Sequence, residues 1–259
     1  ILTGSYKSNT KAVHVLDLTT YAWSLDVASG LDSISIDCND FNKHTCDVVG
    51  QYMYCMGFGF EMTGKIAKLN LNTYAWSEET HGLYYSGFVE AGGGVCDSAD
   101  TSGYLTSTVY NGKIHYVGFG NKDNTKHAVF VYDPATTTFS EYAMKQPGTD
   151  HQYDTEFHGK GAGGYLLGNM WYLFGGQSTL SSSYYRTGGG TYANTYIYAI
   201  DLDNMEAYRN LGNIRLSTSG GIWRPKVGYS SNTKKFYVWG GIKFTGSTNG
   251  NSDNAKIFY

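Results

Sequence analysis

The feature that most constrains the fold is a short apolar strand, ending in glycine, that recurs along the whole chain. Its last glycines are Gly4, Gly59, Gly120, Gly176 and Gly241, so successive copies are 55, 61, 56 and 65 residues apart. Self-similarity at this spacing is typical of repeat architectures, in which each repeat is one supersecondary unit. We therefore interpret the 259 residues as one domain built from five copies of the same unit.

A second strand with alternating apolar residues follows each glycine strand, and in the first four copies it ends at an acid or an amide. A short turn then leads to an aromatic residue that opens the next strand. The sequence Thr-Tyr-Ala-Trp occurs twice in this place, at 20–23 and at 73–76. The acids and amide are Asp17, Asn70, Asp133 and Asp201, and the aromatics are Trp23, Trp76, Phe139 and Tyr208.

The repeat predicts an all-β fold. Its strands show period-two alternation between turns rich in Asn, Gly, Asp and Ser, and no unit has a helical period. A single sheet of this kind cannot bury both faces, whereas radial stacking gives each sheet two neighbours. We expect a β-propeller of five four-stranded antiparallel blades, or six if the chain is a partial product. The expected repeats are approximately 1–29, 30–82, 83–145, 146–214 and 215–259.

These positions together resemble the kelch repeat, which has a Gly-Gly strand, a Tyr-x-x-Asp-like strand and a later Trp. Double glycines stand at 175–176 and 240–241, the second and third copies have Gly-Phe-Gly instead, and the first has only Gly4. The resemblance extends over essentially the whole chain. It implies a kelch-like propeller in which the Gly, Asp and Trp positions are structural.

The charge and the hydropathy of the chain disfavour two classes of partner, nucleic acids and the interior of a membrane. The formal net charge is -3 and the 19 Lys and Arg residues are scattered, which disfavours a nucleic acid partner. No apolar run approaches the roughly 20 residues that cross a bilayer, so we expect no transmembrane segment. Because the sequence starts at Ile1 and stops at Tyr259 within a strand-like run, we expect a processed or partial form of a longer product.

Four cysteines in the first part of the chain are compatible with two disulfides in an oxidising compartment. Cys38 and Cys46 are the expected pair, because the Asn- and Asp-containing sequence around them indicates a loop that a bridge would hold. Four free thiols, with Cys55 as a small core residue, are the alternative. The residues are Cys38, Cys46, Cys55 and Cys96.

One face of the predicted propeller carries the candidate binding residues. Two long loops, 177–195 and 242–255, are expected there, beside the segments that lead into the fourth and fifth blades. Aromatic rings and Arg provide large contact area and planar donors for a glycan or a protein partner. These side chains could equally pack the loops onto the disc. The candidates are Tyr184, Tyr185, Arg186, Tyr192, Trp223 and Arg224.

The segment before the fourth blade holds a candidate site for a divalent metal, and no other cofactor is expected. Its carboxylates and imidazoles suit a hard or borderline metal. Solvated turn acids and a polar packing histidine are the alternative. The residues are His151, Asp154, Glu156 and His158. A second acidic group lacks the spacing of a calcium loop and is interpreted as a solvated loop. It consists of Asp37, Asp40, His44 and Asp47.

No recognisable catalytic motif is present: the sequence has no Gly-x-Ser-x-Gly and no His-Glu-x-x-His. The sequence therefore predicts a non-enzymatic, extracellular or cell-surface binding or assembly module that recognises a protein partner or a glycan. The alternative hypothesis is a metal-dependent enzyme of kelch-propeller type with the His/Asp/Glu site on the same face.

Overall fold

The structure is a computed structural model in which every regular element of the described residues is a β-strand. The all-β prediction is therefore confirmed. The described residues are 2–3, 13–25, 27–30, 45–56, 65–80, 105–117, 128–143, 161–178, 192–193, 197–208, 211, 222–223, 225–243 and 252–253.

Three sheets have four antiparallel strands each, and their strands are consecutive in the sequence apart from one small inserted ladder. The second sheet contains β4 (Thr45–Val49), β5 (Tyr52–Met56), β6 (Lys65–Asn70) and β7 (Trp76–Thr80). The third sheet contains β8 (Thr106–Tyr110), β9 (Lys113–Val117), β10 (Ala128–Asp133) and β11 (Thr138–Ala143). The fourth sheet contains β12 (Ala162–Leu167), β13 (Met170–Gly175), β16 (Ile197–Asp201) and β17 (Glu206–Tyr208).

Smaller sheets lie at the two ends of this series. The N-terminal sheet contains β1 (Leu2–Thr3), β2 (Val13–Leu16) and β3 (Trp23–Ser24). The C-terminal hairpin contains β19 (Lys226–Ser230) and β20 (Lys235–Trp239). Two short ladders complete the set: β14 (Gln177–Ser178) with β15 (Tyr192–Ala193), and β18 (Ile222–Trp223) with β21 (Ile242–Lys243) and β22 (Ser252–Asp253).

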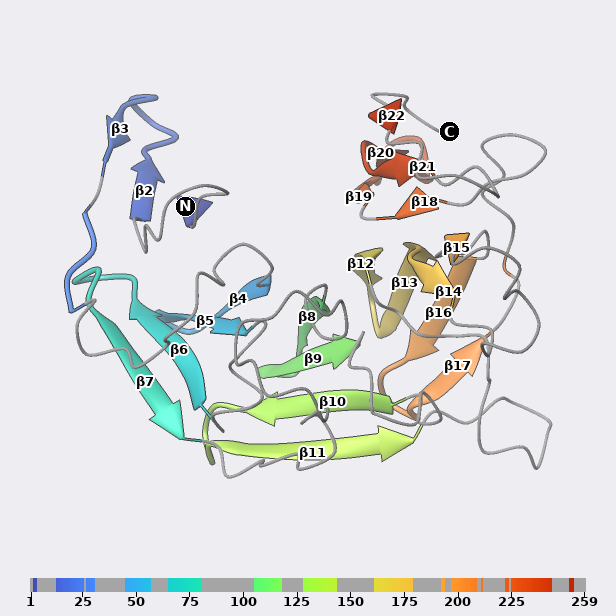
Figure 1. The fold of residues 1–259 in the computed structure, drawn as a ribbon, viewed down its shortest axis with the longest axis horizontal. Helices are drawn as coiled ribbons and strands as arrows, with labels where there is room; N and C mark the ends of the chain where they lie inside the picture. The colour runs from blue at the N-terminus through green and yellow to red at the C-terminus, as the bar shows by residue number, and fades with distance from the viewer. Residues whose placement is uncertain are drawn as a thin grey trace.

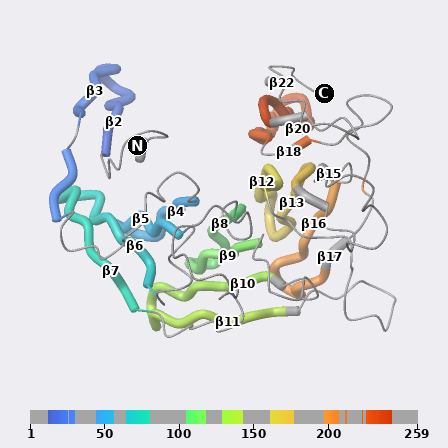
Figure 2. The backbone as a smooth tube through the Cα atoms, viewed as in Figure 1, coloured from blue at the N-terminus to red at the C-terminus, as the bar shows by residue number. Residues whose placement is uncertain are grey.

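The sheets follow one another around an arc that is not closed by the described residues (Figures 1 and 2). The first strands of successive sheets contact one another along the inside of the arc, β4 with β8, β8 with β12, and β12 with β19. Successive strands of each sheet then lead outward. This arrangement places the loops between strands at the two faces of the arc.

Each four-stranded sheet is covered on both faces, because alternate residues of its strands belong to different cores. In the third sheet, Tyr116 and Tyr132 belong to the core shared with the second sheet. Val117 and Val131 belong to the core shared with the fourth sheet. Between the fourth sheet and the C-terminal hairpin the contact is aromatic, and Phe236 lies near the rings of three fourth-sheet residues. These are Tyr165, Tyr172 and Phe174.

The acid or amide after the second repeated strand forms the same turn in each sheet. Asp17 accepts hydrogen bonds from the backbone N–H of Thr19 at 2.7 Å and of Thr20 at 3.2 Å, and these bonds lower the pKa of its carboxyl. Asn70, Asp133 and Asp201 each accept the backbone N–H two residues later. The residue four positions after each acid or amide has positive φ, between 53° and 56°, in all four turns. The repeat therefore extends to backbone conformation.

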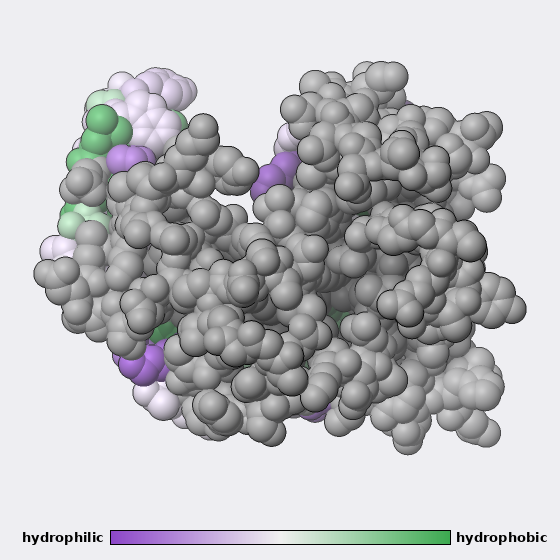
Figure 3. Space-filling view, viewed as in Figure 1, coloured by the Kyte–Doolittle hydropathy of each residue, from purple (hydrophilic) through white to green (hydrophobic). Residues whose placement is uncertain are grey.

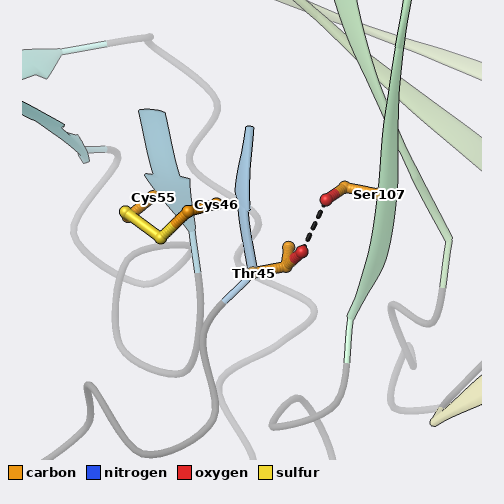
Figure 4. The surroundings of a disulfide bond; sticks show 4 residues. All are labelled: Thr45, Cys46, Cys55 and Ser107. Atoms are coloured by element: carbon orange, nitrogen blue, oxygen red, sulfur yellow. Dashed lines mark hydrogen bonds between the residues drawn. A yellow bond between two sulfur atoms is a disulfide. The ribbon is translucent and has the colours of Figure 1, made fainter. Parts of the chain in front are cut away.

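The predicted Cys38–Cys46 disulfide is wrong, because Cys46 is bonded to Cys55 (Figure 4). The register of β4 and β5 sets Cys46 directly opposite Cys55, with a Cα–Cα distance of 4.1 Å. Such a cross-strand position brings two Cβ atoms within bonding range. Cys38 and Cys96 lie outside the described residues.

Replacing both partners by alanine, Cys46→Ala with Cys55→Ala, is expected to lower the free energy of unfolding by about 2–3 kcal/mol. The bond closes a short loop, and its removal returns conformational entropy to the unfolded chain. Guanidinium denaturation measures the change. A non-reducing chymotryptic digest in which the peptides of Cys46 and Cys55 are not linked would contradict the assignment.

Candidate binding face

The end of β13 lies against β18, and glycine is required at this point. Gly175 has φ of 69°, and a Cβ atom there would lie 2.2 Å from the carbonyl oxygen of Ile222. The N–H of Gly176 donates to the same oxygen at 2.9 Å. A side chain at Gly175 would therefore displace the backbone of the segment that enters the next sheet.

Two ladders start from this contact. In the first, β14 pairs with β15, and Ser178 lies opposite Tyr192. In the second, β18 pairs with β21, and Trp223 lies opposite Ile242. Because Gly176 precedes β14 and Ile222 begins β18, the bases of the two long loops lie next to each other, as Figure 1 shows.

The backbones of Tyr192 and Trp223 are the parts of the predicted binding site that the structure describes. They stand on the two neighbouring ladders. The other candidate partner-binding residues, Tyr184, Tyr185, Arg186 and Arg224, lie outside the described residues. The predicted metal ligands lie outside them as well, namely His151, Asp154, Glu156 and His158. Among the residues that the structure does describe, no group of three His, Cys, Asp or Glu side chains could hold a metal ion.

Asp47 corrects the interpretation of the acidic group as a solvated loop. It lies in β4 with its carboxylate largely buried, and burial raises the pKa of that carboxyl, although a hydrogen bond with Ser107 opposes the shift. Nearby, the hydroxyls of Thr45 and Ser107 lie 2.6 Å apart, which joins β4 to β8 (Figure 4). Period-two alternation in β4 turns Asp47 toward the third sheet. Asp37, Asp40 and His44 lie outside the described residues.

A charged cluster that sequence reasoning missed links the second and third sheets. Lys68 of β6 forms an ion pair with Glu79 of β7, and the hydroxyl of Tyr132 on β10 donates to the same carboxylate. The ammonium of Lys68 lies 4.0 Å from the ring centroid of Tyr52, a cation–π distance. The Tyr54 and Tyr132 rings meet across the interface at 5.7 Å.

The electrostatics of this cluster favour a structural role. Burial lowers the pKa of Lys68, but the hydrogen bond and charge of Glu79 outweigh it, so the net direction is upward. Burial and then the hydrogen bond to Glu79 raise the pKa of the Tyr132 hydroxyl. Lys68 and Tyr132 therefore hold their ordinary charge states more firmly at neutral pH, unlike an acid or base poised to exchange protons. The cluster is a polar cross-link between sheets.

His115 of β9 is buried on the opposite face of the third sheet, with a relative exposure of 3%. Its ring lies 6.1 Å from that of Tyr110, and no described group forms a hydrogen bond with its Nδ1. Burial lowers the pKa of the imidazole to about 4, despite an opposing hydrogen bond with the backbone of Lys113. The folded protein therefore holds His115 neutral.

Comparison with known proteins supports the fold only. No family model matches the chain, and no curated protein sequence matches it. Among solved structures that match, the structure of YjhT has a TM-score of 0.51 and 15% sequence identity. The match covers 77% of this chain and 58% of YjhT, so the chain spans less than two thirds of that structure. Within the described residues, no helix is long and apolar enough to cross a membrane.

Gly175→Ala is expected to destabilise the protein by about 2 kcal/mol or more beyond the effect of the control Gly168→Ala. Both glycines have positive φ, 69° and 66°, but a Cβ at Gly168 meets nothing within 4 Å. The control therefore carries only the backbone strain, and the difference measures the collision with Ile222. Chemical denaturation of both variants tests this. Equal losses would show that β18 does not lie against β13.

His115→Phe is expected to reduce the loss of stability on acidification. The unfolded histidine binds a proton near its ordinary pKa of about 6.5, whereas the folded one stays neutral down to about pH 4. The stability contributed by neutral His115 is complete above that ordinary pKa and is lost as the pH falls toward 4. Between pH 7 and 5 the wild type should lose about 2 kcal/mol more than the variant. Denaturant titrations at both pH values measure this, and parallel losses would refute it.

Proposed function

We propose that the chain is a five-bladed kelch-like β-propeller that acts as a non-enzymatic binding module outside the cell or at its surface. The open arc of antiparallel sheets, the shared turn and the sequence repeat support the propeller. In this assignment β4, β8, β12 and β19 are innermost strands, and the aromatic loops on one face recognise a protein partner or a glycan.

The observation that carries the binding proposal is the junction at Gly175 and Gly176. Two loops, inserted at separate places in the sequence, have their bases on neighbouring ladders that carry Tyr192 and Trp223. Aromatic residues that converge from different loops onto a fixed base are typical of sites that recognise large ligands. The rigid sheets supply the fixed base, and the loops supply the contacts.

The compartment and the non-enzymatic role rest on two further observations. The Cys46–Cys55 disulfide is compatible with an oxidising, extracellular location. In the described residues, the groups whose pKa is strongly shifted lie in the packed sheets, as Tyr132 and His115 do. This placement suits a scaffold held together by its interfaces.

The proposal predicts that Tyr192→Ala and Trp223→Ala each weaken binding at least about tenfold, as expected for aromatic anchors. Binding is measured on glycan arrays and against proteins from the source cell surface. Tyr142→Ala, which removes an exposed aromatic from the outer strand β11, is the control and should bind as the wild type does.

Two outcomes would contradict the proposal. The first is wild-type protein that binds neither glycans nor surface proteins. The second is an equal loss for the Tyr142 control. Stoichiometric metal in protein purified without chelator, with activity that depends on it, would favour the alternative metal-dependent enzyme.

A further inference from the structure

Two tyrosines meet at the contact between the fourth sheet and the C-terminal hairpin, at a place where the third sheet has aliphatic side chains. The second pair from the β8–β9 turn is Val109 opposite Ile114, and both pack in the core shared with the second sheet. The pair at the same place in the hairpin is Tyr229 opposite Phe236. Both rings lie near Tyr165 of the fourth sheet, with a centroid distance of 5.9 Å in each case. This apolar contact therefore carries two phenol groups.

The hydroxyls of Tyr165 and Tyr229 are accessible from solution. Both side chains are half-buried, and neither hydroxyl forms a hydrogen bond with another described residue. Neither is among the buried polar atoms that lack a partner, so both oxygens reach the surface. The two phenols combine a fixed position in the interface with contact to solvent.

Other tyrosine pairs in the described part of the chain differ in access or in origin. The rings of Tyr54 and Tyr132 are 5.7 Å apart, but they are 3% and 0% exposed. The hydroxyl of Tyr132 also donates to Glu79. Tyr52 and Tyr54 lie on the same strand, β5, so a bond between them would join no second sheet. Only at the contact of the fourth sheet with the hairpin do the described residues bring two accessible phenols together from different sheets.

We propose that Tyr165 and Tyr229 are a site of oxidative cross-linking, at which a peroxidase with hydrogen peroxide joins the two rings as dityrosine. Each phenol gives up one electron and its hydroxyl proton. The two radicals join through ring carbons ortho to the oxygens, and the hydrogens on those carbons move to the oxygens. Hydrogen peroxide takes up the two electrons and the two protons and becomes two molecules of water.

The fold holds the two rings in place for this reaction. Their planes are inclined at 43°, and their spacing is one at which ring edges are in contact. The strands that carry them, β12 and β19, pack closely, since a Cβ atom added at Gly163 would lie 2.7 Å from the carbonyl oxygen of Pro225. Two reactants that are already held side by side react faster than two that must meet by diffusion.

The cross-link connects the fourth sheet to the C-terminal hairpin by a covalent bond. Because it closes a long loop of chain, it removes conformational freedom from the unfolded state, as a disulfide does. The Cys46–Cys55 disulfide is compatible with an oxidising compartment, where this reaction can take place. The site uses neither Tyr192 nor Trp223, so this proposal and the proposed function can fail separately.

Treatment of dilute wild-type protein with a haem peroxidase and hydrogen peroxide tests the proposal. The monomer should gain the blue fluorescence of dityrosine and lose the mass of two hydrogen atoms. A digest should contain the peptides of Tyr165 and Tyr229 joined to each other, and the cross-linked monomer should unfold at a higher denaturant concentration. Tyr165→Phe and Tyr229→Phe keep the packed rings, so both variants should fold, and each should lose all of these changes.

Tyr172→Phe is the matched control, because it removes a phenol from the same aromatic cluster. The ring of Tyr172 lies 4.8 Å from that of Phe236, on the sheet that also carries Tyr165. This variant should cross-link as the wild type does.

An exposed tyrosine outside the cluster gives a second comparison. The N-terminal sheet, at the upper left of Figure 3, carries Tyr21, which is 77% exposed. No ring of another described tyrosine lies against it, so coupling there joins two molecules. The yield of that dimer should rise with protein concentration, whereas the yield of the bond within one molecule should not.

Three results would overturn the proposal. The first is dityrosine that forms only between molecules. The second is an unchanged yield within the monomer in both Phe variants. The third is protein from the natural source whose digest contains Tyr165 and Tyr229 only in separate, unlinked peptides.

Discussion

Packing of one antiparallel sheet on the next is the interaction on which the rest of this structure depends. Each four-stranded sheet has apolar residues on both faces, so a neighbour on each side stabilises it. The third sheet shows this most clearly, with Tyr116 and Tyr132 in one core and Val117 and Val131 in the other. The glycine at the end of β13 follows from the same requirement, because the segment that enters the next sheet passes directly over it.

Polar groups between the sheets add specificity to this packing. The ion pair of Lys68 and Glu79 lies within the second sheet, and Tyr132 extends it to the third. Thr45 and Ser107 make a second link between the innermost strands of the same two sheets. Hydrogen bonds with fixed geometry select one alignment of two apolar faces that could otherwise slide past each other. Such rigidity suits the proposed role of the sheets as a base for two binding loops.

Periodicity and turn chemistry are local properties, so the sequence predicted the strands and the turns that follow Asp17, Asn70, Asp133 and Asp201. Partners across a hairpin or between sheets are not local. The pairing of Cys46 with Cys55 follows from the register of β4 and β5, which composition around the cysteines does not show. The tetrapeptides at 20–23 and 73–76 are identical, yet Trp76 is buried and Trp23 is exposed. The difference comes from the neighbouring sheet and not from the local sequence.

The same limit applies to the candidate site. Sequence analysis proposed Tyr192 and Trp223 as binding residues. Only the hydrogen bond from Gly176 to Ile222 shows that the ladders carrying these two residues lie next to each other. Sequence analysis missed the cluster of Lys68, Glu79 and Tyr132. Strand alternation predicts which face of a sheet a residue lies on, but it does not predict which residues of different strands are in contact. Asp47 was misassigned for the same reason, because a carboxylate near Asn and Asp in sequence can still end on a strand that faces another sheet.

The central claim is that this scaffold binds a macromolecular ligand across the face where the two long loops converge. An experimental structure of the protein isolated from its natural source, with its native ligand retained, tests it most directly. The account predicts polypeptide or glycan density against Tyr192 and Trp223. A compact metal ion coordinated by His151, Asp154, Glu156 and His158, with no ligand density on that face, would contradict it.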